Sequence, residues 1–203
     1  MRFLRPRSKL AILAVVAVLA AAGWLILKPS PSNTSTQTAN PISTAAGQST
    51  TGSTSGIAVV ETADFKYEIP IGWVQMQKEI LGQLGATSGI ARVSNTSAVF
   101  KTAISSLTPK DDAELKNNAL NDIKKNAPHF ALLSSVATKV DSKSGQVFTY
   151  SFTDSDGKNK IRQQLSAIPN KGKTFFLLAS SLDSDFDKQS GEFKKILASF
   201  HFK

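Results

Sequence analysis

Hydrophobic and polar positions alternate with a period of two in several segments of residues 57–203, a pattern typical of half-buried β-strands. Segments of this kind are residues 64–70, 73–77, 98–104, 130–140, 147–153 and 160–168. Residues 174–180 differ, because apolar side chains occupy both odd and even positions. Such a strand is covered on both faces. We therefore expect residues 174–180 to be central in an antiparallel sheet that has helices on each face.

Turn-forming residues separate these segments. Residues 141–145, 154–159 and 169–172 are rich in Asp, Asn, Ser and Gly, which favours hairpin connections. Gly82, Gly85 and Gly89 predict an irregular connection between the second and third strands. Together with the helices below, this order of elements predicts an α+β fold.

Two segments have helical spacing. The first is Thr108–Asn126, with Thr108 as the expected N-cap and Leu115, Ala119 and Ile123 at intervals of four residues. The second carries Phe186, Phe193, Ile196, Leu197 and Phe200 on one stripe. Gly191 lies inside it, so we expect this helix to begin near Ser190. The predicted core contains Trp73, Phe148, Phe152, Phe176, Phe193 and Phe200.

The most apolar segment, residues 10–27, contains no charged side chain. As a helix it would be about 27 Å long, close to the roughly 30 Å hydrocarbon core of a bilayer. Four basic residues and no acidic residue precede it. The positive-inside rule therefore places residues 1–9 in the cytoplasm as a basic tail and the chain after Lys28 outside. We expect residues 10–28 to be a single-pass anchor of bacterial type, which holds an extracytoplasmic domain at the cell membrane.

A signal peptide cleaved after Ala22 is the alternative, because Ala20–Ala22 has the small residues of a cleavage site. The apolar run continues through Trp24–Leu27, which favours the anchor. Residues 29–56 contain seven Ser, seven Thr and no charge. They have little apolar surface to bury, so they are predicted to be a disordered linker. One globular domain over residues 57–203 remains.

The net charge of +9 does not indicate a nucleic-acid-binding protein. Five of the 24 basic residues flank the apolar segment, which leaves 19 basic residues against all 15 acidic residues in the predicted domain. These lysines are scattered, and no aromatic residues alternate with them in the manner of a base-stacking platform. The chain contains no cysteine, which excludes disulfides and a lipoprotein signal.

Residues that could carry chemistry form no recognisable constellation. Asp183–Asp187 resembles the opening of a calcium loop, but Lys188 and Lys194 occupy the positions that require Gly and Glu. Asp154–Asn159 has Lys158 where a ligand would be needed. His129 and His201 lack metal-ligand spacing, and no serine lies in a nucleophile elbow. We expect no catalytic, cofactor-binding or metal-binding residue, and no cofactor.

Three short segments resemble the PsbP-like family. Phe65–Trp73 is similar to the strand of that family that ends in a P-x-G-W turn. Lys173–Ser180 and Phe193–Phe200 resemble its penultimate strand and its closing helix. The resemblance covers residues 60–203 and implies an antiparallel sheet between helices, an α/β/α sandwich that usually has no enzymatic activity. Photosynthetic members take part in water oxidation that depends on calcium and manganese. Neither that role nor any metal residue is transferred to this chain.

The function that we expect is therefore a non-catalytic binding module that engages a protein or an envelope ligand. One alternative is a carrier of a lipid or another small apolar molecule in a cavity between the sheet and the helix Thr108–Asn126. A hydrolase is a third alternative, and in it His129 would have to supply nearly all the base chemistry.

Overall fold

The computed structural model describes residues 58–94, 97–127 and 129–203. In chain order, their elements are β1 (Ala58–Glu61), β2 (Phe65–Ile69), β3 (Trp73–Gln75), α2 (Lys78–Gln83), β4 (Ser88–Arg92), β5 (Val99–Ser105), α3 (Asp112–Asn126), β6 (Ala131–Val140), β7 (Lys143–Thr153), β8 (Lys160–Asn170), β9 (Lys173–Leu182), α4 (Phe186–Ala198) and β10 (His201–Phe202).

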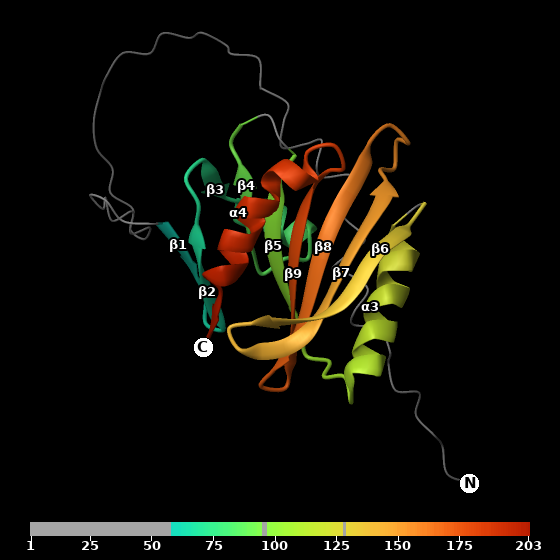
Figure 1. Cartoon of the computed structure of the whole chain (residues 1–203). Helices are drawn as coiled ribbons and strands as arrows, with labels where there is room; N and C mark the ends of the chain where they lie inside the picture. Colours follow the sequence, from blue (N-terminus) through green and yellow to red (C-terminus); the bar gives the residue numbers. More distant parts are fainter. Residues whose placement is uncertain (1–57, 95–96, 128) are drawn as a thin grey trace, which may run out of the picture.

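Seven strands form one sheet in the order β3-β4-β5-β9-β8-β7-β6, and every neighbouring pair is antiparallel. β9 is the middle strand, as its apolar pattern predicts. A smaller sheet has the order β1-β2-β10. Figure 1 shows α4 over one face of the large sheet, near β5 and β9, and α3 beside β6 and β7. The predicted antiparallel sheet with helices on both faces is therefore confirmed for the described residues.

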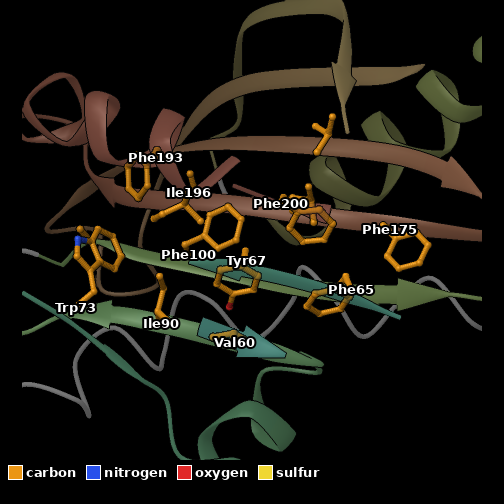
Figure 2. Packing of buried hydrophobic residues seen from close by; sticks show 14 of the residues in the cluster. Val60, Phe65, Tyr67, Trp73, Ile90, Phe100, Phe175, Phe193, Ile196 and Phe200 are labelled. Carbon is orange, nitrogen blue, oxygen red and sulfur yellow. The ribbon is translucent and has the colours of Figure 1, made fainter. Parts of the chain in front are cut away.

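The two faces of β9 belong to two separate cores. Phe175, Leu177 and Ala179 pack with α4 and the small sheet, whereas Phe176 and Leu178 pack with α3. In the first core, rings from both sheets and from the end of α4 lie close together (Figure 2). The six side chains predicted to be buried are all at most 9% exposed, so that prediction is confirmed: Trp73, Phe148, Phe152, Phe176, Phe193 and Phe200.

The helices begin elsewhere than the sequence predicts. The N-cap of α3 is Asp111, not Thr108, because Asp111 Oδ1 accepts a hydrogen bond from the Glu114 amide at 2.8 Å. α4 begins at Phe186 and not near Ser190. Burial of Phe186 against Phe193, with ring centroids 5.5 Å apart, offsets the cost of about 1 kcal/mol that a glycine imposes within a helix.

Four elements were not predicted: β1, α2, β4 and β10. β4 was not predicted because it contains Gly89, and glycine is unfavourable within a strand. The structure requires glycine at this position, since a Cβ there would lie 2.8 Å from the Met76 sulfur and 3.1 Å from a Leu81 methyl. The glycine allows α2 to pack closely on the sheet, so the predicted irregular connection is in fact a helix followed by a strand. β1 and β10 are short strands of four and two residues, too short for a periodic pattern.

The predicted anchor and linker, residues 10–28 and 29–56, lie outside the described residues. Within the described ranges, no helix has both the length and the apolar composition needed to cross a bilayer.

Candidate functional site

The acidic segment Asp183–Asp187 contacts basic side chains. Arg162 donates from Nε to Asp183 Oδ1 at 2.5 Å and from a terminal nitrogen to Asp187 Oδ1 at 3.0 Å. Lys188 pairs with Asp185 at 2.9 Å. The hydrogen bond from Arg162 lowers the pKa of Asp183 below its ordinary value. These acids lie at the start of α4 and form ion pairs, which is a structural arrangement.

The loop Asp154–Asn159 is a hairpin turn, as its composition predicts. Asp154 Oδ1 accepts hydrogen bonds from the backbone amides of Lys158 and Asn159, at 2.9 and 3.2 Å. Its second oxygen accepts from the Asn159 side-chain amide at 2.6 Å. The carboxylate of Asp154 is therefore used to close the turn.

The two histidines lie at opposite ends of β6. His129 precedes the strand, is exposed and has a positive φ of 52°. His201 Nδ1 lies 3.1 Å from Asp141 Oδ1, immediately after the end of the strand. A strand of ten residues is about 33 Å long, so the structure does not bring the two imidazoles together. Among the described residues, no group of three His, Asp or Glu side chains could hold a metal ion.

The sequence did not single out Lys101, which is 1% exposed in the middle of β5. Its register partners are Gly89 in β4 and Leu178 in β9. Burial lowers the pKa of Lys101 to about 8, because the interior disfavours the charged ammonium. No local pattern in the sequence marks it, because the burial of Lys101 follows from the positions of β4 and β9 on either side of β5.

A buried chain of hydrogen bonds crosses the same face of the sheet. Tyr150 Oη donates to Gln163 Oε1 at 2.6 Å, and Gln163 Nε2 donates to Ser180 Oγ at 3.1 Å. Burial raises the pKa of Tyr150 far above its ordinary value. The three side chains belong to β7, β8 and β9 and satisfy one another, so they fix the pairing of these strands.

Beneath α3 the structure has a packed core. Ile123, Phe148 and Leu165 are at most 2% exposed there, and Leu115 and Phe176 complete the same cluster. The interface between α3 and the sheet is therefore filled by side chains of the described residues. This packing gives no support to the alternative of a carrier with a ligand cavity at this place.

The tryptophan of the predicted P-x-G-W turn joins three elements. Trp73 Nε1 in β3 donates to Glu192 Oε2 in α4 at 2.5 Å. Glu192 also pairs with Arg92 of β4 at 3.1 Å, and Arg92 donates a hydrogen bond to Gln189 of α4. The Trp73 ring meets Phe193 edge-on, with centroids 5.8 Å apart. Trp73 is thus a structural residue that fixes α4 on the sheet.

The edge strand β6 carries a group of exposed apolar side chains. Seven of its ten residues are exposed, and they include three large apolar side chains: Leu132 (42% exposed), Leu133 (52%) and Val136 (54%). Val136 pairs with Val147 and Leu132 with Tyr150, so these two side chains lie on opposite faces of the sheet. The register shifts between Leu132 and Ser134, which marks a bulge at Leu133. We call Leu132, Leu133, Val136 and the outer edge of β6 the β6 surface.

Lysines flank the β6 surface. Lys139 lies near the end of the strand, and Lys143 begins β7 just after the turn; both are exposed. Lys124 and Lys125 are exposed in the last turn of α3, just before the strand. Within the ranges described, none of the four forms an ion pair. The β6 surface is thus an apolar strand edge with positive charge at both ends.

Solved structures show the same fold at low sequence identity. Cyanobacterial PsbP (CyanoP) from Synechocystis sp. PCC 6803 superposes with a TM-score of 0.55 and 14% identity, over 77% of this chain and 98% of that chain. LpqN of Mycobacterium tuberculosis, described as involved in cell envelope biogenesis, gives a TM-score of 0.50 and 17% identity, over 72% and 85% of the two chains. No curated protein sequence matches the chain.

The family model for PsbP matches residues 56–202, which contain both sheets and all three described helices. The P-x-G-W turn, the central strand β9 and the closing helix α4, on which the predicted resemblance was based, all lie within this range. The chain belongs to the PsbP family.

Proposed function

We propose that this protein is a non-catalytic binding module that is anchored in the cell membrane by residues 10–28 and binds an envelope protein through the β6 surface. The observation that carries the proposal is the exposure of three large apolar side chains on one edge strand. Exposed apolar side chains grouped on a strand edge favour association with another protein, since they gain from burial that the isolated domain does not provide.

The rest of the domain supports a binding role. Its acidic segment is occupied by ion pairs with Arg162 and Lys188, and its histidines lie at opposite ends of β6. The buried Tyr150, Gln163 and Ser180 satisfy one another and are closed to substrate. A hydrolase would need a base beside a nucleophile at an accessible place. The described residues with exposed functional groups do not provide that pair.

The location rests on the sequence and on one comparison. Four basic residues precede an apolar run long enough to span a bilayer, and they favour an extracytoplasmic domain. LpqN, which has a similar fold, is described as involved in envelope biogenesis. This supports an envelope role for the present domain.

The location is tested by protease treatment of intact cells that carry the full chain with a tag at each end. We expect loss of the C-terminal tag and protection of the N-terminal tag. Disruption of the membrane should expose both tags. A mature protein that begins at Gly23 would show that the segment is a cleaved signal and would contradict the anchor.

The interface is tested by photo-crosslinking in the native membrane. A crosslinking residue at position 137 in β6 should capture a partner, whereas one at position 74 in β3, the opposite edge, should not. The double substitution Leu133→Ser and Val136→Ser should abolish the crosslink from position 137. Val74→Ser is the matched control, because Val74 is 51% exposed and Val136 is 54% exposed. Equal capture from positions 74 and 137 would contradict the proposed interface. Copurified lipid that depends on no β6 residue would favour the carrier.

A further inference from the structure

The backbone of β6 has a defined set of free hydrogen-bonding groups on its outer edge. Asp141 and Ser142 form a two-residue turn with φ values of 46° and 64°, which is the type I′ conformation. Val140 and Lys143, on either side of this turn, are therefore a hydrogen-bonded pair. Backbone groups alternate in direction along a strand. Those of Val136 and Thr138 thus point toward β7.

The backbone groups of Ser135, Ala137 and Lys139 consequently point outward, away from the sheet. No described strand lies beyond β6. The three residues span about 14 Å of extended chain. This stretch is regular, since the bulge at Leu133 lies before it. Proteins commonly protect such an edge with proline, a bulge or a charged side chain. Residues 135–139 contain no proline and no bulge, and their one charged side chain is Lys139 at the end.

The charges around this edge select its partner. Lys139 and Lys143 lie at one end, and Lys124 and Lys125 lie at the other. Of the acids nearby, Asp141 is engaged, because it accepts from the Phe202 amide at 2.9 Å and contacts His201. Asp122 is half-buried, and the burial of its carboxyl raises its pKa. The free edge therefore lies between two positive ends, which favour carboxylates.

We propose that β6 binds an extended acidic segment of another protein by strand addition. This inference rests on the proposed function and names its ligand class. The added strand pairs with the outward groups of Ser135, Ala137 and Lys139. Its alternate apolar side chains cover Val136, and Asp or Glu residues at its ends meet the lysines.

Two other occupants fit less well. A second copy of the domain, paired antiparallel edge to edge, would bring the Lys139 and Lys143 end of one copy beside the Lys124 and Lys125 end of the other, without added acids. A lipid surface would contact the lysines and Val136 but would not offer the row of backbone donors and acceptors that the outward groups require. An acidic strand satisfies all three features.

The experiment uses the full chain in nanodiscs and labelled peptides as long as β6. One peptide alternates Val and Thr and has Glu at both ends, a second has Lys at both ends, and a third carries a central proline. We expect only the Glu-ended peptide to bind. Its affinity should fall as salt is raised, because charges contribute to binding. Equal binding of the Glu-ended and Lys-ended peptides would overturn the charge selection.

Two variants separate the backbone from the charges. Ala137→Pro removes one outward N–H and should weaken peptide binding by about tenfold or more, whereas Ala137→Val keeps the N–H and should bind as the natural protein does. The double variant Lys139→Glu and Lys143→Glu should bind the Lys-ended peptide in preference to the Glu-ended peptide. The double variant Lys78→Glu and Lys194→Glu makes the same charge change at exposed positions of α2 and α4, and it should still prefer the Glu-ended peptide. Unchanged binding by Ala137→Pro would overturn strand addition.

The remaining outcomes also decide between the proposals. A dimer in light scattering that Ala137→Pro dissociates would assign the edge to a second copy, and binding to phosphatidylcholine–phosphatidylglycerol vesicles but to no peptide would assign it to lipid. A partner crosslinked from position 137 in the native membrane, with no binding of any peptide, would overturn strand addition and keep the proposed function. Failure of both the crosslink and the peptides would overturn both.

Discussion

β9 and β6 are strands of the same sheet and of the same length, ten residues each, yet their surroundings are opposite. Eight side chains of β9 are buried, and seven residues of β6 are exposed. β9 contains Phe175, Phe176, Leu177 and Leu178, and β6 contains Leu132, Leu133 and Val136. Both segments are apolar enough to be read as strands. They differ in pattern and in place: β9 is apolar on both faces and lies in the middle of the sheet, whereas β6 alternates and lies at its edge.

This difference indicates what the apolar residues of each strand do. Those of β9 contact α4 on one face and α3 on the other, so their burial stabilises the fold. In β6, only Val140 at the end of the strand is buried in a core. Leu132, Leu133 and Val136 contribute little burial, and the isolated domain gains little from them. An apolar side chain that does not stabilise the fold, on a strand with a free edge, is best explained by association with a partner.

The largest expected effect tests the stabilising role of β9. Leu177→Ala should lower the free energy of unfolding by about 2–5 kcal/mol, because Leu177 is 1% exposed and a cavity would remain. Leu133→Ala in β6 removes the same atoms from a side chain that is 52% exposed, and it should change stability by no more than about 0.5 kcal/mol. Denaturant midpoints of the two variants measure the contrast. Similar losses would show that β6 contributes to the core.

Next in size is the pH dependence that Lys101 introduces beside β9. The pKa of Lys101 is about 8 in the folded state and about 10.4 in the unfolded chain, so between these values only the unfolded state holds the proton. Stability should therefore rise with pH across this window, by about 3 kcal/mol in total. Lys101→Met should abolish the rise. Lys124→Met, at an exposed lysine, is the control and should keep it. A flat profile in the natural protein would contradict the buried charge.

Gly145 tests how closely the hairpin of β6 and β7 packs on its neighbour. A Cβ at this position would lie 2.3 Å from the Ala167 carbonyl oxygen in β8. Gly145→Ala should therefore destabilise the domain by about 1–3 kcal/mol, since backbone must move to admit the methyl group. Gly82→Ala in α2, where a Cβ meets nothing within 4 Å, should be neutral or slightly stabilising. The midpoints of thermal unfolding of the two variants measure this difference. Equal midpoints would show that β7 can shift freely to admit the methyl group.

The sequence predicted what depends on local pattern. β9 was recognised as central because its side chains are apolar on both faces, and α3 was recognised from the spacing of Leu115, Ala119 and Ile123. The membership of the PsbP family was predicted from short segments and is now shown by a match over residues 56–202.

What depends on distant contacts could not be predicted. The period of β6 is that of any half-buried strand, because edge position is decided by which strands lie beyond it and not by the strand itself. β4 could not be predicted because it contains Gly89. This glycine is required by the close packing of Met76, which the local sequence does not show. The β6 surface therefore had no signal at the level of pattern, and Lys101 could be recognised as buried only after β4 and β9 were placed on either side of β5.

The smallest expected effect concerns the contact that holds the end of β6. Asp141 follows this strand and accepts a hydrogen bond from the Phe202 amide in β10, and it also contacts His201. In Figure 1 the β6–β7 hairpin reaches toward the C-terminus. These contacts hold the pKa of Asp141 below its ordinary value, so the carboxylate stabilises the folded state above about pH 3.9 and this contribution is lost as the pH falls.

Asp141→Asn is the appropriate change, because asparagine tolerates the positive φ of 46° and keeps an oxygen for the Phe202 amide. It should lower stability at neutral pH by no more than about 1 kcal/mol, as expected of an exposed ion pair. The difference from the natural protein should vanish in acid, where Asp141 itself is protonated. Asp156→Asn, in the exposed β7–β8 loop, is the control for loss of a surface carboxylate and should leave stability at neutral pH unchanged. A loss as large as that of Leu177→Ala would mean that this contact, and not β9, controls how firmly β6 is held, and the contrast between the two strands would then fail.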